Sequence, residues 1–343
     1  MPIDPDALTK AAQAGVHDGD APAALSVRDL SVHIPIPGGR VLRAVDGISF
    51  ALRRGETLGL VGESGSGKTM TAMAIMRLLE GPLANAVRGQ VLLDGVELLG
   101  LAESAMSDVR GAALGMVFQE PMTSLNPVMR IGRQIQEPLR RHLGLSAAEA
   151  SARAQEMLAL VKIPDPRRAM ALYPYELSGG MRQRVMIAIA LACRPAMLIA
   201  DEPTTALDVT IQAQILALMA ELQDRMGTAI LLITHDLAVI AETAHRVAVM
   251  YAGRIVEIAP VEALFATPLH PYTQGLLASI PRIERERAPT LHEIRGSISD
   301  AANREGCAFA PRCPRAASVC GQAPALEQVA AGHEVACWRH GDG

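Results

Sequence analysis

The sequence predicts an α/β fold, in which the short buried strands of a parallel sheet alternate with helices. A glycine-rich loop at residues 62–69 lies between an apolar run and a helical run. A second apolar run, residues 197–200, ends in the acids Asp201 and Glu202. Strand and helix patterns continue to alternate after that point, which is typical of a parallel sheet with crossover helices.

The first elements follow in order along the chain. Residues 25–54 predict short strands joined by a turn that is rich in proline and glycine. Residues 57–61 are apolar and end at a glycine, as a buried strand does, and residues 70–79 have a helical pattern. Residues 91–93 precede an Asp-Gly pair, which predicts a hairpin.

The second half of this region begins with helices. Residues 127–192 have a helical pattern, in which Ser146 and Glu149 form the signature of a capping box. Residues 229–234 are another candidate for a buried strand, and Asp208 is placed to cap the helix before it. An Ala-Gly pair beyond this strand predicts a second hairpin.

Composition limits the class of protein. Half of the 343 residues are hydrophobic, enough for a large core, and the net charge of −4 argues against nucleic acid as a partner. No apolar run reaches the roughly 18 residues that a membrane-spanning helix needs. Because residues 1–24 have neither a basic start nor an apolar stretch, we expect a flexible leader, a cytosolic protein and no framework of disulfides.

The glycine-rich loop matches the phosphate-binding pattern G-x-x-x-x-G-K-[ST] in full. Glycines let backbone N–H groups surround phosphate oxygens, and the helix that follows adds its positive end. The lysine reaches the outer phosphates, and the hydroxyl after it is a magnesium ligand. A glycine-rich turn with a chance lysine is the alternative, and the flanking strand and helix argue against it. The predicted nucleotide-binding residues are Gly62, Glu63, Ser64, Gly65, Ser66, Gly67, Lys68 and Thr69.

The acidic strand end predicts hydrolysis. Asp201, at the tip of an apolar strand, is placed to hold magnesium through water, and Glu202 is placed to polarise a water that attacks the γ-phosphate. The alternative is an acid that only caps the next helix. The phosphate loop upstream argues against that alternative.

Further motifs occur in the order typical of the ATP-binding cassette (ABC) transporter ATPases, which the chain resembles over about residues 25–258. Each motif alone is weak, because a lone glutamine or histidine is usually an ordinary polar residue, but their ordered combination is specific. The resemblance implies a P-loop NTPase core with an N-terminal antiparallel β subdomain and a helical subdomain. The motifs are Lys68, Gln119, Leu177-Ser178-Gly179-Gly180, Asp201-Glu202, Asp208 and His235.

The resemblance also implies a role for each motif. Gln119 senses magnesium and the transmembrane partner, and His235 lies at the γ-phosphate. Asp208 belongs to the D-loop, which has Thr205 where serine is usual. The implied catalytic residues are Glu202, His235 and Gln119, and the implied magnesium ligands are Thr69, Gln119 and Asp201. The residues that would bind ATP held by a second subunit are Ser178, Gly179 and Gly180.

Two positions depart from the pattern of the family. Met181 replaces the glutamine of the common signature. The family stacks adenine on an aromatic residue upstream of the phosphate loop, but no residue between Val32 and Ser49 is aromatic. Aliphatic residues near Val41 are left to contact the base, so how adenine is held stays open.

The C-terminal region narrows the resemblance. Residues 270–277 resemble the segment that follows the ATPase core in oligopeptide and dipeptide importers, and residues 306–314 with Cys320, His333 and Cys337 resemble the C-terminal domain of dipeptide-type subunits. We therefore expect three parts. They are a leader at 1–24, an ABC ATPase domain at 25–260 with its helical subdomain at about 125–192, and a C-terminal domain with four cysteines at 261–343.

The four cysteines are spaced C-x5-C-x6-C-x16-C. This spacing fits neither the usual zinc pairs nor the common ferredoxin runs, so it leaves the ligand open. The resemblance implies a [4Fe–4S] cluster, and zinc, a disulfide pair and unligated thiols are the alternatives. A fifth cysteine, Cys193, is expected in the core. The implied cluster ligands are Cys307, Cys313, Cys320 and Cys337.

The motifs and the resemblance together predict an ATP hydrolase, with ATP and Mg2+, that powers the import of di- and oligopeptides. The implied partners are a second ATPase subunit, favoured to be a paralogue, two transmembrane permease subunits and, indirectly, an extracytoplasmic peptide-binding protein. The chain would then be peripheral, on the cytoplasmic face of the inner membrane. The solute stays open, because other subunits select it.

Three alternatives remain. One is an importer of nickel, glutathione or another small solute, since related ATPases serve these. Another is a soluble ABC ATPase of DNA repair or translation, which usually carries two cassettes or a long insertion. The third is a non-catalytic regulatory subunit, against which the intact Lys68, Glu202 and His235 argue.

Overall fold

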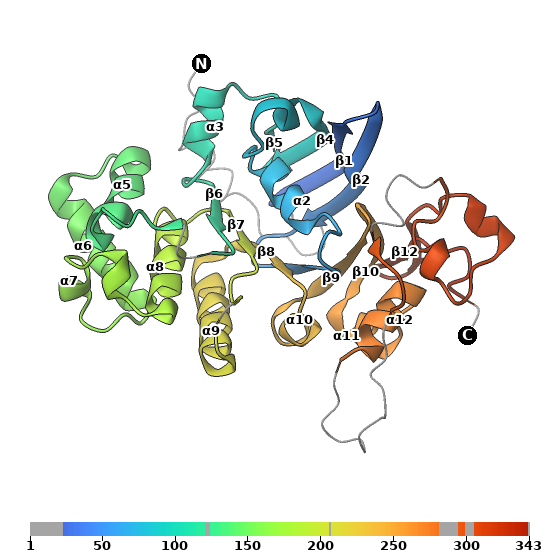
Figure 1. Ribbon diagram of the computed structural model, residues 1–343. Coiled ribbons are helices and arrows are strands. Elements are labelled where there is room, and N and C mark those ends of the chain that lie inside the picture. Colours follow the sequence, from blue (N-terminus) through green and yellow to red (C-terminus); the bar gives the residue numbers. More distant parts are fainter. Residues whose placement is uncertain (1–22, 121–123, 206, 281–293, 299–304, 342–343) are drawn as a thin grey trace. The chain divides into compact units, whose positions relative to one another are not determined.

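The computed structural model describes residues 23–120, 124–205, 207–280, 294–298 and 305–341 (Figure 1). The predicted leader, residues 1–24, lies almost wholly outside them. Contacts within the chain define two units, which we describe one at a time. The first unit comprises Met1–Ser26, Ala51–Thr57 and Leu92–Ile233, and the second comprises Val27–Phe50, Leu58–Val91 and Thr234–Gly343.

A parallel sheet forms the centre of the first unit. Its strands are β6 (Leu114–Val117), β7 (Met197–Asp201) and β8 (Ala229–Thr234), and every residue of the three is buried. Val117 pairs with Ala200, and Asp201 pairs with Ile233. The carboxyl ends of the three strands therefore meet at one edge. The α/β fold class and the strands predicted at 197–200 and 229–234 are confirmed.

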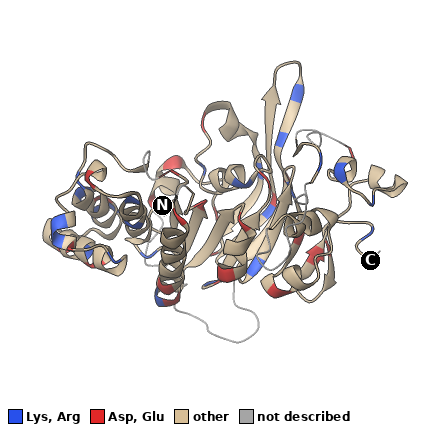
Figure 2. Cartoon of the chain, turned by 60° about the horizontal axis from the view of Figure 1, so that its bottom comes forward, with Lys and Arg blue, Asp and Glu red and all other residues tan. Residues whose placement is uncertain are grey.

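Helices make up most of the rest of the first unit, and both signs of charge occur along them (Figure 2). The capping box predicted at Ser146 is confirmed, because its Oγ accepts from the backbone N of Glu149 at 3.3 Å and the Glu149 carboxylate accepts from the backbone N of Ser146 at 2.8 Å. Prolines such as Pro166 and Pro174 divide the predicted helical stretch into separate helices. The helices described in the first unit are α3 (Glu103–Val109), α5 (Ile131–Leu143), α6 (Ala147–Leu160), α7 (Pro166–Ala169), η2 (Pro174–Glu176), α8 (Gly179–Leu191) and α9 (Val209–Met226).

Antiparallel strands open the second unit. β1 (Leu25–Ile36) lies between β2 (Arg40–Leu52) and β4 (Val87–Leu93), which follows the short helix η1 (Gly81–Ala86). The predicted strands at 25–54 and the turn after residue 93 are confirmed. After that turn, the short strand β5 (Val96–Glu97) pairs back onto the end of β4.

The second unit also holds a mixed sheet in the order β11-β12-β10-β9-β3. β3 pairs in parallel with β9, and β9 and β10 form the predicted hairpin, whose turn residues Ala252 and Gly253 have φ values of 46° and 83°. The C-terminal region adds β12 to this sheet, with Val335 opposite Glu257. The strands are β3 (Thr57–Val61), β9 (Arg246–Tyr251), β10 (Arg254–Pro260), β11 (Glu327–Ala330) and β12 (His333–Val335).

Short helices complete the second unit. The helix predicted at 70–79 is α2, which begins earlier, at Lys68, and ends earlier, at Ile75, because Arg77 adopts a φ of 52° that no helix continues. Within the described part of the chain, none of the helices combines the length and the apolar character needed to cross a membrane. The others are α10 (Leu237–Thr243), α11 (Val261–Ala266), α12 (Pro271–Ala278), η4 (Ala310–Arg312) and η5 (Ser318–Gly321).

Candidate functional site

The glycine-rich loop lies in the second unit, between the buried strand β3 and helix α2. Gly67 caps the helix with a φ of 107°, and a Cβ there would lie 2.3 Å from the backbone O of Ala44. Only glycine meets both demands. The loop therefore has the backbone path that turns N–H groups inward around an anion.

Lys68 folds back over this loop. Its Nζ donates to the backbone O of Gly62 at 2.7 Å and to that of Glu63 at 3.1 Å, and its side chain is almost fully buried. Charge-assisted hydrogen bonds from an ammonium group to phosphate oxygens are strong, so Lys68 is placed to bind a phosphate on this loop. Thr69 follows in the first turn of α2 and offers a hydroxyl oxygen, a ligand type that Mg2+ prefers.

The acidic pair lies in the first unit, at the end of β7. Asp201 is the last residue of the strand and is 3% exposed. Glu202 follows with a φ of 46°, and its backbone N donates to the O of Ile233 at 2.8 Å. A residue other than glycine in this left-handed region is strained by roughly 1–3 kcal/mol, and such strain concentrates at functional sites.

Gln119 reaches this acid from the neighbouring strand. It lies two residues after the end of β6, and its Nε2 donates to Glu202 Oε2 at 3.0 Å. Thr205 Oγ1 donates to the same oxygen at 2.8 Å. The structure therefore brings together two of the three predicted catalytic residues. The third, His235, is exposed and follows the last residue of β8 directly.

The signature residues open helix α8, also in the first unit. Ser178 caps this helix, with its Oγ accepting from the N of Met181 at 3.3 Å. Leu177 is buried, whereas Ser178 and Gly179 are exposed. Gly180 faces Ile211, which lies in α9, the helix that Asp208 caps. The apolar residues thus hold the helix in place and leave the serine on the surface.

The four C-terminal cysteines line one small cavity of the second unit. The pKa values of Cys307, Cys313 and Cys337 are raised above the ordinary thiol value by burial, and backbone N–H groups directed at their sulfurs offset only part of this effect. Among the residues that the structure describes, no group of three or more His, Cys, Asp and Glu side chains is arranged to hold a metal ion. The lining is Cys307, Cys313, Cys320, Cys337, His270, Pro271, Phe309, Arg315, Trp338 and Arg339.

The position of His333 differs from what the sequence suggests, whereas that of Cys193 does not. His333, which the sequence groups with the cysteines, contacts the fully buried carboxylate of Glu257, with Nε2 2.8 Å from Oε1. Cys193 lies in the core as predicted, and burial raises the pKa of its thiol to about 11.

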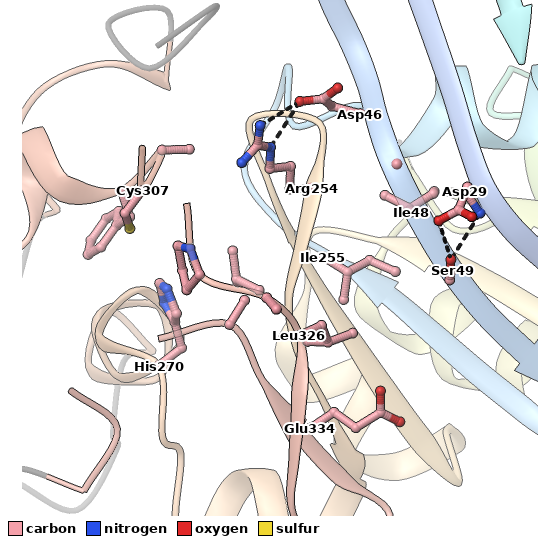
Figure 3. Close-up of a pocket in the computed structure, with 17 residues that line it drawn as sticks. Asp29, Asp46, Ile48, Ser49, Arg254, Ile255, His270, Cys307, Leu326 and Glu334 are labelled. Atoms are coloured by element: carbon pink, nitrogen blue, oxygen red, sulfur yellow. Dashed lines mark hydrogen bonds and ion pairs between the residues drawn. The ribbon is translucent and has the colours of Figure 1, made fainter. Parts of the chain in front are cut away.

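A larger cavity of about 420 Å³ opens next to the cysteines (Figure 3). Cys307, His270 and Phe309 line both cavities. Within the larger one, Asp46 accepts two hydrogen bonds from Arg254, at 2.7 and 3.0 Å. No local sequence pattern predicts this cavity, because its walls come from segments that are far apart in the chain.

Comparisons with known proteins agree with the motifs. Residues 45–205 match the family "ABC transporter", and residues 256–320 match "Oligopeptide/dipeptide transporter, C-terminal region". A probable peptide ABC transporter ATP-binding protein of Sinorhizobium fredii is 55% identical over 92% of this chain and 94% of its own length. The oligopeptide transport ATP-binding protein OppD of Escherichia coli is 49% identical over 93% of this chain and 94% of its own.

A solved structure supports the fold. The dimeric ABC transporter cassette MJ0796 superposes with a TM-score of 0.61 at 27% identity, over 69% of this chain and 98% of its own. The same cassette was also solved as a dimer bound to ADP and Pi. The two matched families and the relatives, which align over almost the whole chain, lead to one conclusion: this chain belongs to the ATP-binding subunits of ABC transporters, in their oligopeptide/dipeptide group.

Proposed function

We propose that this chain binds and hydrolyses ATP to power the import of di- and oligopeptides through partner permeases. The observation that carries the proposal is the combination, in one chain, of a region that matches the ABC transporter family with the C-terminal region of oligopeptide and dipeptide transporters. Relatives that are 49% identical or more are named as peptide or oligopeptide transport ATP-binding proteins.

In this proposal Glu202 is the general base. Gln119 and Thr205 both donate to Glu202 Oε2, and these two bonds orient the carboxylate that would take a proton from the attacking water. Lys68 and the loop N–H groups would bind the β- and γ-phosphates, and His235 would contact the γ-phosphate. Oxygen donors suited to Mg2+ are present on Thr69, Gln119 and Asp201, and the bound ion would neutralise phosphate charge.

The proposed active unit is a dimer of ATPase subunits. The chain has one phosphate loop and one signature, and the signature serine is exposed. Ser178, Gly179 and Gly180 would bind ATP on the loop of a second subunit, which we propose to be a paralogue. Two permeases would hold the pair at the cytoplasmic face of the membrane, and a peptide-binding protein outside would supply the solute.

We also propose that the four cysteines hold a [4Fe–4S] cluster. Four thiols that line one cavity are the donor set of such clusters. Arg315 and Arg339 add positive charge. Protein purified without oxygen should be brown and contain iron and sulfide in similar amounts. Colourless protein loaded with zinc, or intact metal-free protein, would contradict the cluster.

The transport proposal is tested on the assembled complex. With its permeases in proteoliposomes and the binding protein outside, dipeptides should stimulate ATP hydrolysis and accumulate inside. The same complex with Lys68→Met should do neither and serves as the control. If nickel or glutathione stimulated ATP hydrolysis and peptides did not, that solute would take the place of peptides in the proposal. ATP hydrolysis without any transport would contradict the proposed function.

A further inference from the structure

Glu63, the second residue of the phosphate loop, is bound by a side chain from the C-terminal region. Arg312 Nη1 donates to Glu63 Oε2 at 2.9 Å, and Nη2 donates to Oε1 at 3.2 Å. These two bonds form a bidentate pair, the most directional contact that a carboxylate makes with a side chain. The two residues are 249 positions apart in the chain, and both belong to the second unit.

Arg312 is itself held in place. Its Nε donates to the O of Arg295 and its Nη2 donates to the O of Ile294, both at 2.8 Å. Its guanidinium lies over the ring of Tyr251, 5.7 Å from the centroid, and the side chain is only 4% exposed. An arginine fixed on so many sides loses little freedom when it binds Glu63, so it can set where the loop lies.

Tyr272 holds the same residue through the backbone. Its hydroxyl accepts from the N of Glu63 at 2.9 Å, and its ring is fully buried. The residue before its helix positions it, since His270 Nδ1 accepts from the N of Tyr272 at 3.0 Å. Glu257 in turn accepts from the N of His270 at 3.0 Å. These hydrogen bonds connect the phosphate loop, through the start of α12, to Glu257 in β10.

The backbone of Glu63 is central to the loop. Its O accepts from Lys68 Nζ at 3.1 Å and from the N of Ser66 at 3.1 Å. A rotation of the Glu63 peptide would therefore move both the ammonium group and an N–H group of the loop. Arg312 and Tyr272 restrict that rotation from the side-chain end and from the backbone end.

We propose that Arg312 and Tyr272 are positioning residues for ATP: they hold Glu63 so that the loop has its nucleotide-binding shape before ATP arrives. The C-terminal region then sets nucleotide affinity as well as carrying cysteines. This inference rests on the proposed function of the loop. Neither residue touches the nucleotide, so the effect of changing them should fall on ATP affinity more than on the chemical step.

The test compares Arg312→Met and Tyr272→Phe with Arg88→Met. Arg88 is an exposed arginine of the same unit, and its Nη1 donates to the backbone O of Asn85 at 2.7 Å and to that of Val87 at 2.8 Å. The Kd for a fluorescent ATP analogue is measured on the full chain, and kcat at saturating ATP on the assembled complex. We expect Kd to rise about tenfold in Arg312→Met and several-fold in Tyr272→Phe, with kcat within about twofold of wild type, and Arg88→Met to bind like wild type.

A double-mutant cycle separates positioning from a general loss of structure. If Arg312 acts through Glu63, Arg312→Met should add little in a Glu63→Gln background. Additive effects, or unchanged Kd in folded Arg312→Met and Tyr272→Phe, would overturn the proposal. Tyr272→Phe removes one oxygen only and decides the matter if Arg312→Met does not fold. Wild-type protein that fails to bind the analogue would instead contradict the proposed function.

Discussion

Gln119 and Glu202 meet although 83 positions separate them, with Gln119 Nε2 3.0 Å from Glu202 Oε2. Parallel pairing of β6 and β7 brings them together, because Val117 lies opposite Ala200 and each polar residue follows two positions later. The contact orients one carboxylate oxygen and adds a donor at the end of two buried strands. A base at this place can be changed without disturbing the strands below it.

Glu202→Gln should bind ATP but hydrolyse it slowly. The amide is nearly the same size as the carboxylate and can keep the contact with Gln119, but it cannot take a proton. A general base contributes about 10²–10⁴-fold to a rate, so ATPase activity of the assembled complex should fall by at least about a hundredfold. Turnover is measured by phosphate release, and binding with a fluorescent ATP analogue. Near-normal turnover would remove Glu202 from the role of base.

Lys68→Met should lose nucleotide affinity. The substitution keeps the length of the side chain and removes the ammonium group that now bonds to the loop carbonyls. Charge-assisted hydrogen bonds contribute about 1.5–3 kcal/mol, so the Kd for the ATP analogue should rise by at least about tenfold. Lys162→Met is the matched control, because Lys162 pairs with Glu221 on the surface. Equal effects of the two changes on the Kd would mean that Lys68 does not bind the nucleotide.

Contiguous motifs were predictable, and long-range pairs were not. The cap at Ser146 was predicted because Glu149 lies three positions later, and Ser178 likewise accepts from the backbone N three positions later. The contact of Arg312 with Glu63 has no such signal, because the fold alone brings these residues together. Arg312 lies in the segment 306–314 that resembles the C-terminal domain, but nothing in the sequence singles it out among thirty-two Lys and Arg residues as the partner of Glu63. A pair of this kind can be predicted only from the tertiary structure, because the packing of several strands brings the two residues together.

Gly62→Ala should destabilise the chain and weaken ATP binding. A Cβ at this position would lie 2.1 Å from the backbone O of Met250 and 2.9 Å from Ser66 Oγ, and neither strand nor loop can yield cheaply. Overpacking of this kind costs about 1–3 kcal/mol or more, which should lower the Tm by several degrees. Gly321→Ala is the control, because a Cβ there meets nothing within 4 Å. Equal melting of the two variants would contradict the close contact of the loop with β9.

Asp46 should make the stability of the chain depend on pH. Burial alone would raise the pKa of Asp46, but hydrogen bonds from Arg254 and His33 and the charges of Arg254 and Arg43 lower it below its usual value. A carboxyl whose pKa is lower in the folded state stabilises the protein at a pH above its unfolded value, about 4. This contribution is lost as the pH falls through the folded value.

Asp46→Asn should therefore reduce the free energy of unfolding by about 1–3 kcal/mol at neutral pH, because hydrogen bonds to the charged Arg254 are weakened. Below about pH 4 the difference from wild type should shrink, since wild-type Asp46 becomes neutral as well. Tm measured from pH 7 down to pH 3 checks both parts. Glu221→Gln, which alters a partly exposed carboxylate paired with Lys162 and Arg225, should stay close to wild type throughout. If the Tm difference between Asp46→Asn and wild type widened in acid, the ion pair of Asp46 with Arg254 would not be the source of the stabilisation.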